Sequence, residues 1–336
     1  MRETFFRPYL GQATDGRRGP LRIQAMDSLI LGVDGGQTST KCVLMDAEGR
    51  VLGHGRGAGL IHLAAEGGPE RMRQALGACI SSAFADAGIE ARPLDAMGLG
   101  LSGISSAEAP EAETVRTLVA EAFAPRIVMV ENDAYTALLG AHAGGPGVVA
   151  ISGTGSIVCG LNARGNLVRA GGWGWLLGDE GSALWIGRNG LMAALQAADE
   201  IGPPTALVSR FLSYFEIGDL LSVKPLVYRS DFGAKGFAAL AAVLSDAARD
   251  GDAVALGVVA SAGAALAELV AAVVRRLGPD SILPVAPVGG AFEHVHGLRD
   301  EFMRALAGLA PGCPVIDPLT SPMHGAALMA RRAAEL

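Results

Sequence analysis

Two short turns, one in each half of the chain, combine glycine with acidic or hydroxyl residues. The first is Asp34-Gly35-Gly36-Gln37-Thr38 and the second is Ser152-Gly153-Thr154-Gly155-Ser156, each directly after an apolar run. Backbone N–H groups that small residues leave bare, flanked by hydroxyls, bind phosphate oxygens well. Either turn alone fits an ordinary hairpin, since Asp-Gly is a common turn dipeptide. Their repetition favours two turns that hold one polyphosphate between them.

Two aspartates follow predicted strands at positions suited to phosphate transfer. Asp34 is placed to hold a hydrated Mg²⁺, with Thr38 next to a terminal phosphate. Asp133 follows the apolar strand 126–130 and precedes a predicted helix over 134–143, and ligand sites gather at such strand ends. A carboxylate there can accept the proton of a substrate hydroxyl that attacks a γ-phosphate. Asp133 also suits a helix N-cap, and one residue can serve both roles.

The stretch from Gly171 to Ser182 gathers glycines, two indoles and two acids before a predicted helix. Asp179 or Glu180 could hydrogen-bond sugar hydroxyls, and an indole can cover the apolar face of a sugar. The alternative is a packed structural loop that ends in Ser182 as an N-cap. We favour a substrate-binding loop, because buried carboxylates without a role are costly.

A third glycine pair, Gly289-Gly290 before Ala291, ends a predicted strand over 282–288. Its bare backbone would let a flat base or a ribose lie against it, and the alternative is a simple tight turn. His294 and His296 lie nearby, but two histidines at this spacing beside a helix rarely form a metal site alone. The pattern therefore predicts a nucleotide contact and gives no reason to expect a metal ligand here.

Strands and helices alternate in the first half, which indicates an α/β domain with a mixed sheet. The strand–turn–strand pattern that starts at Leu29 recurs from Val148. We therefore expect a duplicated two-domain fold with a cleft between the domains. The second half is richer in helix. Apolar periodicity predicts helices over 69–88, 111–123, 134–143, 182–199, 236–249, 252–277, 298–309 and 322–334.

The composition of the 336-residue chain is that of a globular protein, since half of its residues are hydrophobic and 18% are charged. A net charge of -7 argues against a general nucleic-acid binder. The apolar run 254–274 reads as a buried helix rather than a membrane span, and residues 1–25 lack the apolar core of a signal peptide. We therefore expect a cytoplasmic protein. Its four scattered cysteines fit buried, reduced thiols.

In their order, these motifs resemble the N-acetylglucosamine kinase and bacterial glucosamine kinase branch of the BadF/BadG/BcrA/BcrD ATPases, within the actin, hexokinase and Hsp70 superfamily. The resemblance runs from Leu29 to the C-terminus and rests on the two turns, Asn132-Asp133-Ala134, Gly289-Gly290 and, above all, the stretch Gly171 to Ser182. It implies two ribonuclease H-like domains. One would span 27–143 together with 322–336 and the other 144–321, after an extension over 1–26.

The resemblance also implies transfer of the γ-phosphate of Mg-ATP to the 6-hydroxyl of N-acetylglucosamine or glucosamine, by a homodimer. Asp133 would be the catalytic base, and Asp34 would hold Mg²⁺. ATP would contact Asp34, Gly35, Gly36, Gln37, Thr38, Gly153, Thr154, Gly155, Gly236, Gly289, Gly290 and Ala291. The sugar would contact Asn132, Ser156, Ile157, Gly172, Trp173, Gly174, Trp175, Asp179 and Glu180.

Three positions depart from the family pattern. Gln37 replaces a usual glycine, Ser39 replaces a lysine common in bacterial members, and Ile61 stands where these kinases place a sugar-binding asparagine. An isoleucine cannot make the hydrogen bonds of an amide, so a substrate group loses its partner there.

Two other functions stay open from the sequence. One is an ATPase activator of 2-hydroxyacyl-CoA dehydratases, whose iron–sulfur cluster needs a set of cysteines that the scattered thiols of this chain do not offer. The other is a nucleotide- or sugar-binding regulator without catalysis.

Overall fold

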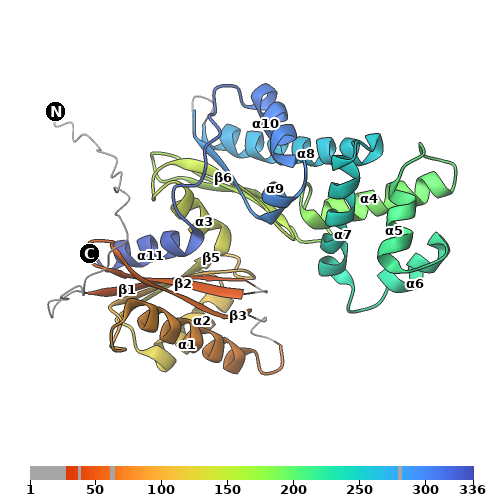
Figure 1. The fold of residues 1–336 in the computed structure, drawn as a ribbon. Coiled ribbons are helices and arrows are strands. Elements are labelled where there is room, and N and C mark those ends of the chain that lie inside the picture. The colour runs from red at the N-terminus through yellow and green to blue at the C-terminus, as the bar shows by residue number, and fades with distance from the viewer. Residues whose placement is uncertain (1–27, 37–38, 61–64, 279–281) are drawn as a thin grey trace.

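A computed structural model describes residues 28–36, 39–60, 65–278 and 282–336. Within them the chain forms two mixed β-sheets, one of five strands and one of four, each flanked by helices (Figure 1). The α/β class and the mixed sheets predicted from the sequence are confirmed. Gln37, Thr38 and Ile61, which the sequence singled out, lie outside the described residues.

The first sheet has the strand order β3-β2-β1-β4-β5. Its strands are β1 (Leu29–Gly35), β2 (Ser39–Asp46), β3 (Val51–Ala58), β4 (Ala96–Leu101) and β5 (Ile127–Asn132). β1 pairs antiparallel with β2 but parallel with β4, and β4 runs parallel to β5. The carboxyl ends of β1, β4 and β5 therefore meet at one edge, where ligands of open α/β sheets bind.

Helices cover both faces of the first sheet, which is why β1 and β4 are apolar along nearly their whole length. One face packs on α1 (Gly68–Ala87) and α2 (Pro110–Phe123), and the other packs on α3 (Asp133–Ala141) and α11 (Pro322–Ala333). α11 lies very close to the strands. A Cβ atom at Gly32 of β1 would lie 2.0 Å from the carbonyl oxygen of Met323, and one at Gly98 of β4 would lie 2.0 Å from that of Ala326. Only glycine fits at these two strand positions.

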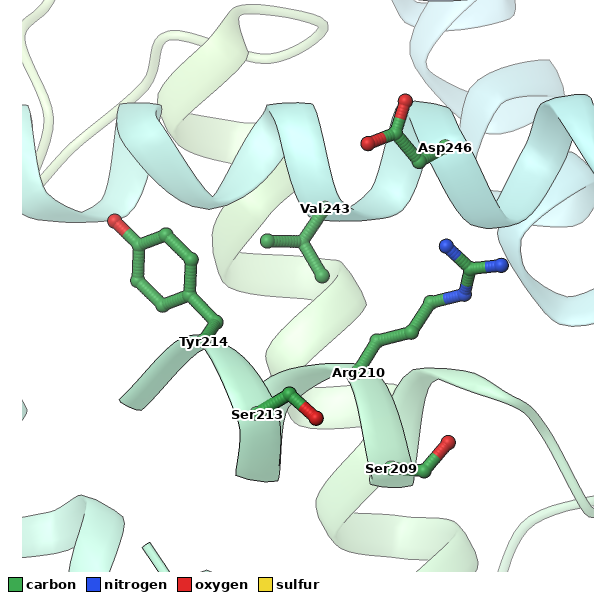
Figure 2. Close-up of a pocket in the computed structure, with 6 residues that line it drawn as sticks. All are labelled: Ser209, Arg210, Ser213, Tyr214, Val243 and Asp246. Atoms are coloured by element: carbon green, nitrogen blue, oxygen red, sulfur yellow. The ribbon is translucent and has the colours of Figure 1, made fainter. Parts of the chain in front are cut away.

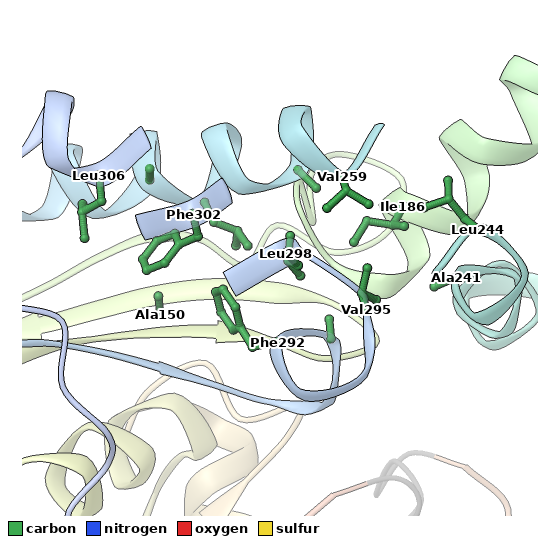
Figure 3. Packing of buried hydrophobic residues seen from close by; sticks show 14 of the residues in the cluster. Ala150, Ile186, Ala241, Leu244, Val259, Phe292, Val295, Leu298, Phe302 and Leu306 are labelled. Carbon is green, nitrogen blue, oxygen red and sulfur yellow. The ribbon is translucent and has the colours of Figure 1, made fainter. Parts of the chain in front are cut away.

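The second sheet has the order β8-β7-β6-β9, with β6 (Gly147–Ser152), β7 (Ser156–Leu161), β8 (Leu167–Gly171) and β9 (Val285–Val288). α8 (Ala253–Leu277) and α10 (Leu298–Leu309) cover one face. Figure 3 shows Phe302 of α10 and Val259 of α8 packed in the same apolar cluster as Ala150 of β6. α3 lies against the other face and contacts β6 and β7. The α3 helix is therefore shared between the two sheets.

Four of the remaining helices form a lobe at the far end of the second sheet (Figure 1). They are α4 (Ala183–Ala198), α5 (Leu207–Phe215), α6 (Val223–Val227) and α7 (Gly233–Arg249), with a 3₁₀ turn over Leu220–Ser222. The short α9 (Gly290–His294) follows β9 and contacts β6, β9 and α10 instead. The most extensive packing in this lobe is between α4 and α7. Gly187 of α4 has no side chain, so the backbone of α7 packs directly against it.

Among the described residues, α8 is the one helix that is long and apolar enough to cross a membrane by length and composition. Half of its most apolar stretch is buried inside the protein. It packs on α10, α4 and α7 and on three strands of the second sheet. Its hydrophobicity is therefore that of a central core helix, as the sequence predicted.

Candidate functional site

Asp133 is the first residue of α3, but Asn132 is the residue that caps this helix. The Oδ1 atom of Asn132 accepts a hydrogen bond from the backbone N–H of Ala134 at 2.9 Å, and its Nδ2 atom donates to the carbonyl oxygen of Ile104 at 2.6 Å. Both ends of the Asn132 amide are thus committed to the protein. The capping role considered for Asp133 falls to its neighbour, so the Asp133 carboxyl is available for another task.

Two carboxylates meet at the ligand-binding edge of the first sheet. Asp34 ends β1, and Asp133 follows β5, with β4 between them. Burial raises the pKa of Asp133 to about 6, and the nearby negative charge of Asp34 adds to the rise. Burial also raises the pKa of Asp34, and the positive charge of Lys41 opposes that rise. A carboxylate with a pKa near neutrality is suited to accept a proton.

A pH profile checks the protonation state of Asp133 directly. If Asp133 is the base, kcat/KM should fall about tenfold per pH unit below pH 6, because only the deprotonated carboxylate accepts a proton. Initial rates between pH 4.5 and 8 measure this, with circular dichroism at each pH as the control for folding. A flat profile across that range would remove Asp133 from the proton transfer.

The first turn joins β1 to β2 next to these carboxylates. The backbone N–H of Gly36 donates to the carbonyl oxygen of Ser39 at 3.1 Å, and the carbonyl oxygen of Gly36 accepts from Leu60 at 2.9 Å. A Cβ at Gly35 would lie 2.5 Å from a methyl of Leu101 and 2.6 Å from a methyl of Leu60. Glycine at 35 is therefore required by the fold itself.

The second turn joins β6 to β7 and is tied to the start of α4. The carbonyl oxygens of Gly153 and Thr154 accept hydrogen bonds from Ala183 and Leu184 at 2.9 and 3.3 Å, and Gly153 donates to Gly155 at 2.9 Å. These bonds hold the turn rigidly against the helix. A Cβ at Gly153 would meet no other atom within 4 Å, so this residue faces open space.

Asp179 links the second turn to the loop that precedes α4. It is buried, and its Oδ1 atom accepts a hydrogen bond from the backbone N–H of Ser156 at 3.1 Å. The Ser156 hydroxyl in turn donates to the carbonyl oxygen of Glu180 at 2.7 Å. Burial raises the pKa of Asp179, and the Ser156 N–H bond counteracts it. The Ser182 hydroxyl oxygen caps α4 by accepting a hydrogen bond from the backbone N–H of Trp185. The loop therefore also has the structural role of starting this helix.

The loop over residues 171–177 carries exposed apolar side chains. Gly171, Gly172 and Gly174 all have φ near +70 to +84°, which lets the loop turn sharply. A Cβ at Gly172 would lie 2.7 Å from the Cδ1 atom of Ile157, so the loop is folded down on β7. Trp173 is 66% exposed, although the Arg169 guanidinium lies 5.6 Å from the centre of its ring. The exposed indole therefore offers a broad apolar ring face on the surface of this loop.

A cavity of about 510 Å³ opens beside the second turn. Gly153, Thr154, Gly290 and Ala291, four residues predicted to contact the nucleotide, line it, and α7 supplies a further wall. That wall consists of Ala238, Ala239, Ala241, Ala242, Ser245, Asp246 and Arg249. The alanines keep the wall flat and shallow, which suits a planar base. These α7 residues were not predicted from the sequence to line a ligand site.

Two of the predicted nucleotide contacts do not line this cavity. Gly289 has φ of +107°, and a Cβ there would lie 2.4 Å from the carbonyl oxygen of Ser152. Gly236 lies in the first turn of α7 against the ring of Phe232. Both positions need glycine for packing. Asp34, Gly35 and Gly36, the described residues of the first turn, do not line the cavity either, and its described lining residues all belong to the second half of the chain.

A further hollow of about 420 Å³ lies between α5 and α7 (Figure 2). Ser209, Arg210, Ser213 and Tyr214 of α5 face Val243 and Asp246 of α7 across it. Among the described residues, none of those predicted to bind ATP or sugar lines this hollow.

Cys42, Cys79 and Cys159 are buried and form no disulfide, as predicted, whereas Cys313 is partly exposed. Cys42 and Cys79 are neighbours, and the Cys42 thiol donates to the carbonyl oxygen of Cys79 at 3.2 Å. Burial raises the pKa of Cys159 to about 12, with a further contribution from the charge of Asp133. Asp133 is therefore close to β7 of the second sheet. No group of three or more His, Cys, Asp or Glu side chains among the described residues is arranged to hold a metal ion by itself.

Comparison with known proteins places these observations in a family. A model of the BadF/BadG/BcrA/BcrD ATPase family matches residues 31–330. The chain is 28% identical over 304 residues to the N-acetylmuramic acid/N-acetylglucosamine kinase of Clostridium acetobutylicum, which covers 90% of this chain and 98% of that protein. It is 29% identical over 316 residues to the N-acetyl-D-glucosamine kinase of Dictyostelium discoideum, covering 90% of this chain and 97% of that protein.

A solved structure extends the likeness to three dimensions. The crystal structure of a protein from Chromobacterium violaceum, provisionally assigned as an N-acetylglucosamine kinase, superposes with a TM-score of 0.75. The two chains are 30% identical, and the superposition covers 90% of this chain and 98% of the other. The likeness therefore spans both sheets and the helical lobe.

Proposed function

Because the chain belongs to the BadF/BadG/BcrA/BcrD ATPase family, we propose that it transfers the γ-phosphate of ATP to the 6-hydroxyl of N-acetylglucosamine or glucosamine. The chain is an ATP-dependent phosphotransferase of the sugar-kinase type, as its relatives over nine-tenths of its length are. The observation that carries the finer proposal is the Asp133 carboxyl, which is partly buried at the strand end, is not the cap of its helix and has a pKa raised to about 6.

Asp133 acts in this proposal as the general base. The sugar hydroxyl attacks the γ-phosphorus, a bond forms between that phosphorus and the sugar O6, and the bond to the bridging oxygen of ADP breaks. The hydroxyl proton passes to the Asp133 carboxylate. Near pH 7 this carboxylate is mostly ionised, and its raised pKa still gives it more basicity than an exposed aspartate has.

Asp34 suits the position of a magnesium-binding residue. Mg²⁺ in kinases is bound through one or two carboxylates together with phosphate oxygens and water, so a single protein carboxylate at the strand end is sufficient. The ion would neutralise phosphate charge when bound. Its positive charge would also lower the pKa of Asp34, which burial raises in the protein alone.

The nucleotide in this proposal lies with its base in the 510 Å³ cavity and its phosphates against the second turn. The first turn meets the terminal phosphate from the other half of the chain. The sugar lies under Trp173, with its hydroxyls toward Asp179. We also propose that the protein is a homodimer, as the family resemblance implies. The bare face of Gly153 and the exposed indole of Trp173 support these placements.

The test is ATP consumption by the purified protein over glucosamine, N-acetylglucosamine, N-acetylmannosamine, N-acetylmuramate and glucose. We expect a strong preference for one of the first two sugars, with the product phosphorylated on oxygen 6. Good ATP binding with a flat response across the panel would contradict the proposal and favour a nucleotide-dependent regulator. Turnover of ATP without any sugar would favour an ATPase activator.

A further inference from the structure

Three charged residues stand side by side across the first three strands of the first sheet. Asp34 of β1 is directly opposite Lys41 of β2, and Lys41 is directly opposite Arg56 of β3. Directly opposed residues of antiparallel strands project from the same face of the sheet. The three side chains therefore form a row, and the row begins at the carboxylate that lies beside Asp133.

Neighbouring contacts fix the face on which this row lies. Gly32, two residues before Asp34, contacts the backbone of Met323 at the start of α11. His54, two residues before Arg56, has its ring 6.1 Å from that of His324 in the same helix. The row is thus on the side of α11 and α3, which is turned toward the second half of the molecule (Figure 1). α11 begins at Pro322, and Lys41 and Arg56 are both exposed.

The two cations of the row outnumber its single carboxylate, Asp34. Like charges directly opposite each other destabilise a strand pair. Neither Lys41 nor Arg56 forms an ion pair with any of the described residues, and Lys41 acts on the Asp34 carboxyl only through its charge. Two adjacent cations beside one carboxylate leave the row with an excess of positive charge next to Asp133, and this excess indicates an anionic ligand.

We propose that Lys41 and Arg56 form an oxyanion-binding site that holds the phosphoryl group during its transfer to the sugar. This inference rests on the proposed kinase function, since the anion is the γ-phosphoryl group of ATP before transfer and the 6-phosphate of the sugar afterwards. The planar guanidinium of Arg56 can bind two phosphoryl oxygens at once, and the ammonium of Lys41 supplies a point charge. Charge that accumulates on the equatorial oxygens is stabilised there, while the hydroxyl proton passes to Asp133.

Direct binding measurements separate this site from catalysis. Calorimetry of wild type and of the Lys41→Met, Arg56→Met double variant with N-acetylglucosamine 6-phosphate and with N-acetylglucosamine gives the two affinities. We expect the double variant to bind the 6-phosphate roughly ten- to hundredfold more weakly, as for loss of charged hydrogen bonds, and the neutral sugar within about twofold of wild type. Arg71→Met, an exposed change on α1 at the opposite face of the sheet, removes the same charge and should alter neither affinity.

Several results would overturn the inference. These are equal losses for both ligands, no loss for the 6-phosphate, or no binding of the 6-phosphate by wild type. A second double variant, Lys41→Arg with Arg56→Met, keeps a cation at position 41. It should bind the 6-phosphate more tightly than the Lys41→Met, Arg56→Met variant, and equal affinities would also count against the site. Normal turnover by Asp133→Asn would instead refute the base, and it leaves the result of this binding test unaffected.

Discussion

Asp133→Asn is expected to lower kcat by about 10²- to 10⁴-fold while the affinity for ATP stays near that of wild type. The amide fills the same volume but cannot accept the hydroxyl proton. Because Asn132 caps α3, the substitution leaves the start of the helix intact. Steady-state rates, together with nucleotide binding followed by fluorescence or calorimetry, measure both quantities.

The same variant should gain stability in the absence of ligands. The folded-state pKa of Asp133, about 6, lies above the ordinary value of 3.8, so the buried carboxylate destabilises the fold at neutral pH. This cost is complete above pH 6 and disappears as the pH falls through 6 toward 3.8. If Asp133→Asn melts at a higher temperature than wild type at pH 7.5 but has lost turnover, Asp133 serves catalysis at the expense of stability. Unchanged turnover would exclude Asp133 as the base, and a lower melting temperature would mean that its role is structural.

Gly155→Ala is expected to lower kcat/KM by about 100-fold through two effects at once. A Cβ at this position would lie 2.9 Å from both carboxylate oxygens of Asp179, so the carboxylate must move and its bond to Ser156 is strained or lost. The added methyl group also narrows the approach of a phosphate to the turn. The KM values for ATP and for the sugar should therefore both rise.

Gly153→Ala is the matched control in the same turn. Its Cβ would meet no protein atom within 4 Å, so Asp179 should keep its place and the KM for the sugar should stay near that of wild type. The KM for ATP should rise, because the open space beside Gly153 is where the phosphates are expected. Normal kinetic constants for Gly155→Ala, or equal effects of both variants on the sugar, would contradict this division of roles.

Elements with strong apolar periodicity were predictable from the sequence. α10 has the bounds predicted, and α1, α2, α4, α8 and α11 differ by a residue or so at their ends. β3 was missed because glycine occupies every second position, at 53, 55 and 57, where β-formers would be expected. The structure gives the reason. α1 packs so closely on this strand that a Cβ at Gly55 would lie 2.0 Å from the carbonyl oxygen of Cys79.

β9 also differs from the prediction, since it begins at Val285 rather than at residue 282. Pro284 cannot donate to a strand partner, and its carbonyl oxygen instead accepts from Val148. Strand β8 and the short helices α5, α6 and α9 were not predicted, because short elements give few positions from which to read a pattern.

The parts of the site that depend on local sequence were predictable, and those that depend on register were not. Glycine turns after strands and an aspartate at a strand end are visible in the sequence. The raised pKa of Asp133 depends on its burial and on Asp34, which is far away along the chain. The alignment of Lys41 with Arg56 requires the pairing of β2 with β3, and the flat alanine wall of the cavity requires the packing of α7 on α4.

The central claim is that the two glycine turns hold one ATP while Asp133 lies beside the attacking hydroxyl. A crystal structure of the Asp133→Asn protein with Mg-ATP and N-acetylglucosamine tests it most directly. We expect the triphosphate to touch both the turn at 34–38 and the turn at 152–156, with the sugar O6 about 3 Å from the side chain at position 133. Phosphates bound by one turn alone, or an O6 atom far from position 133, would contradict it.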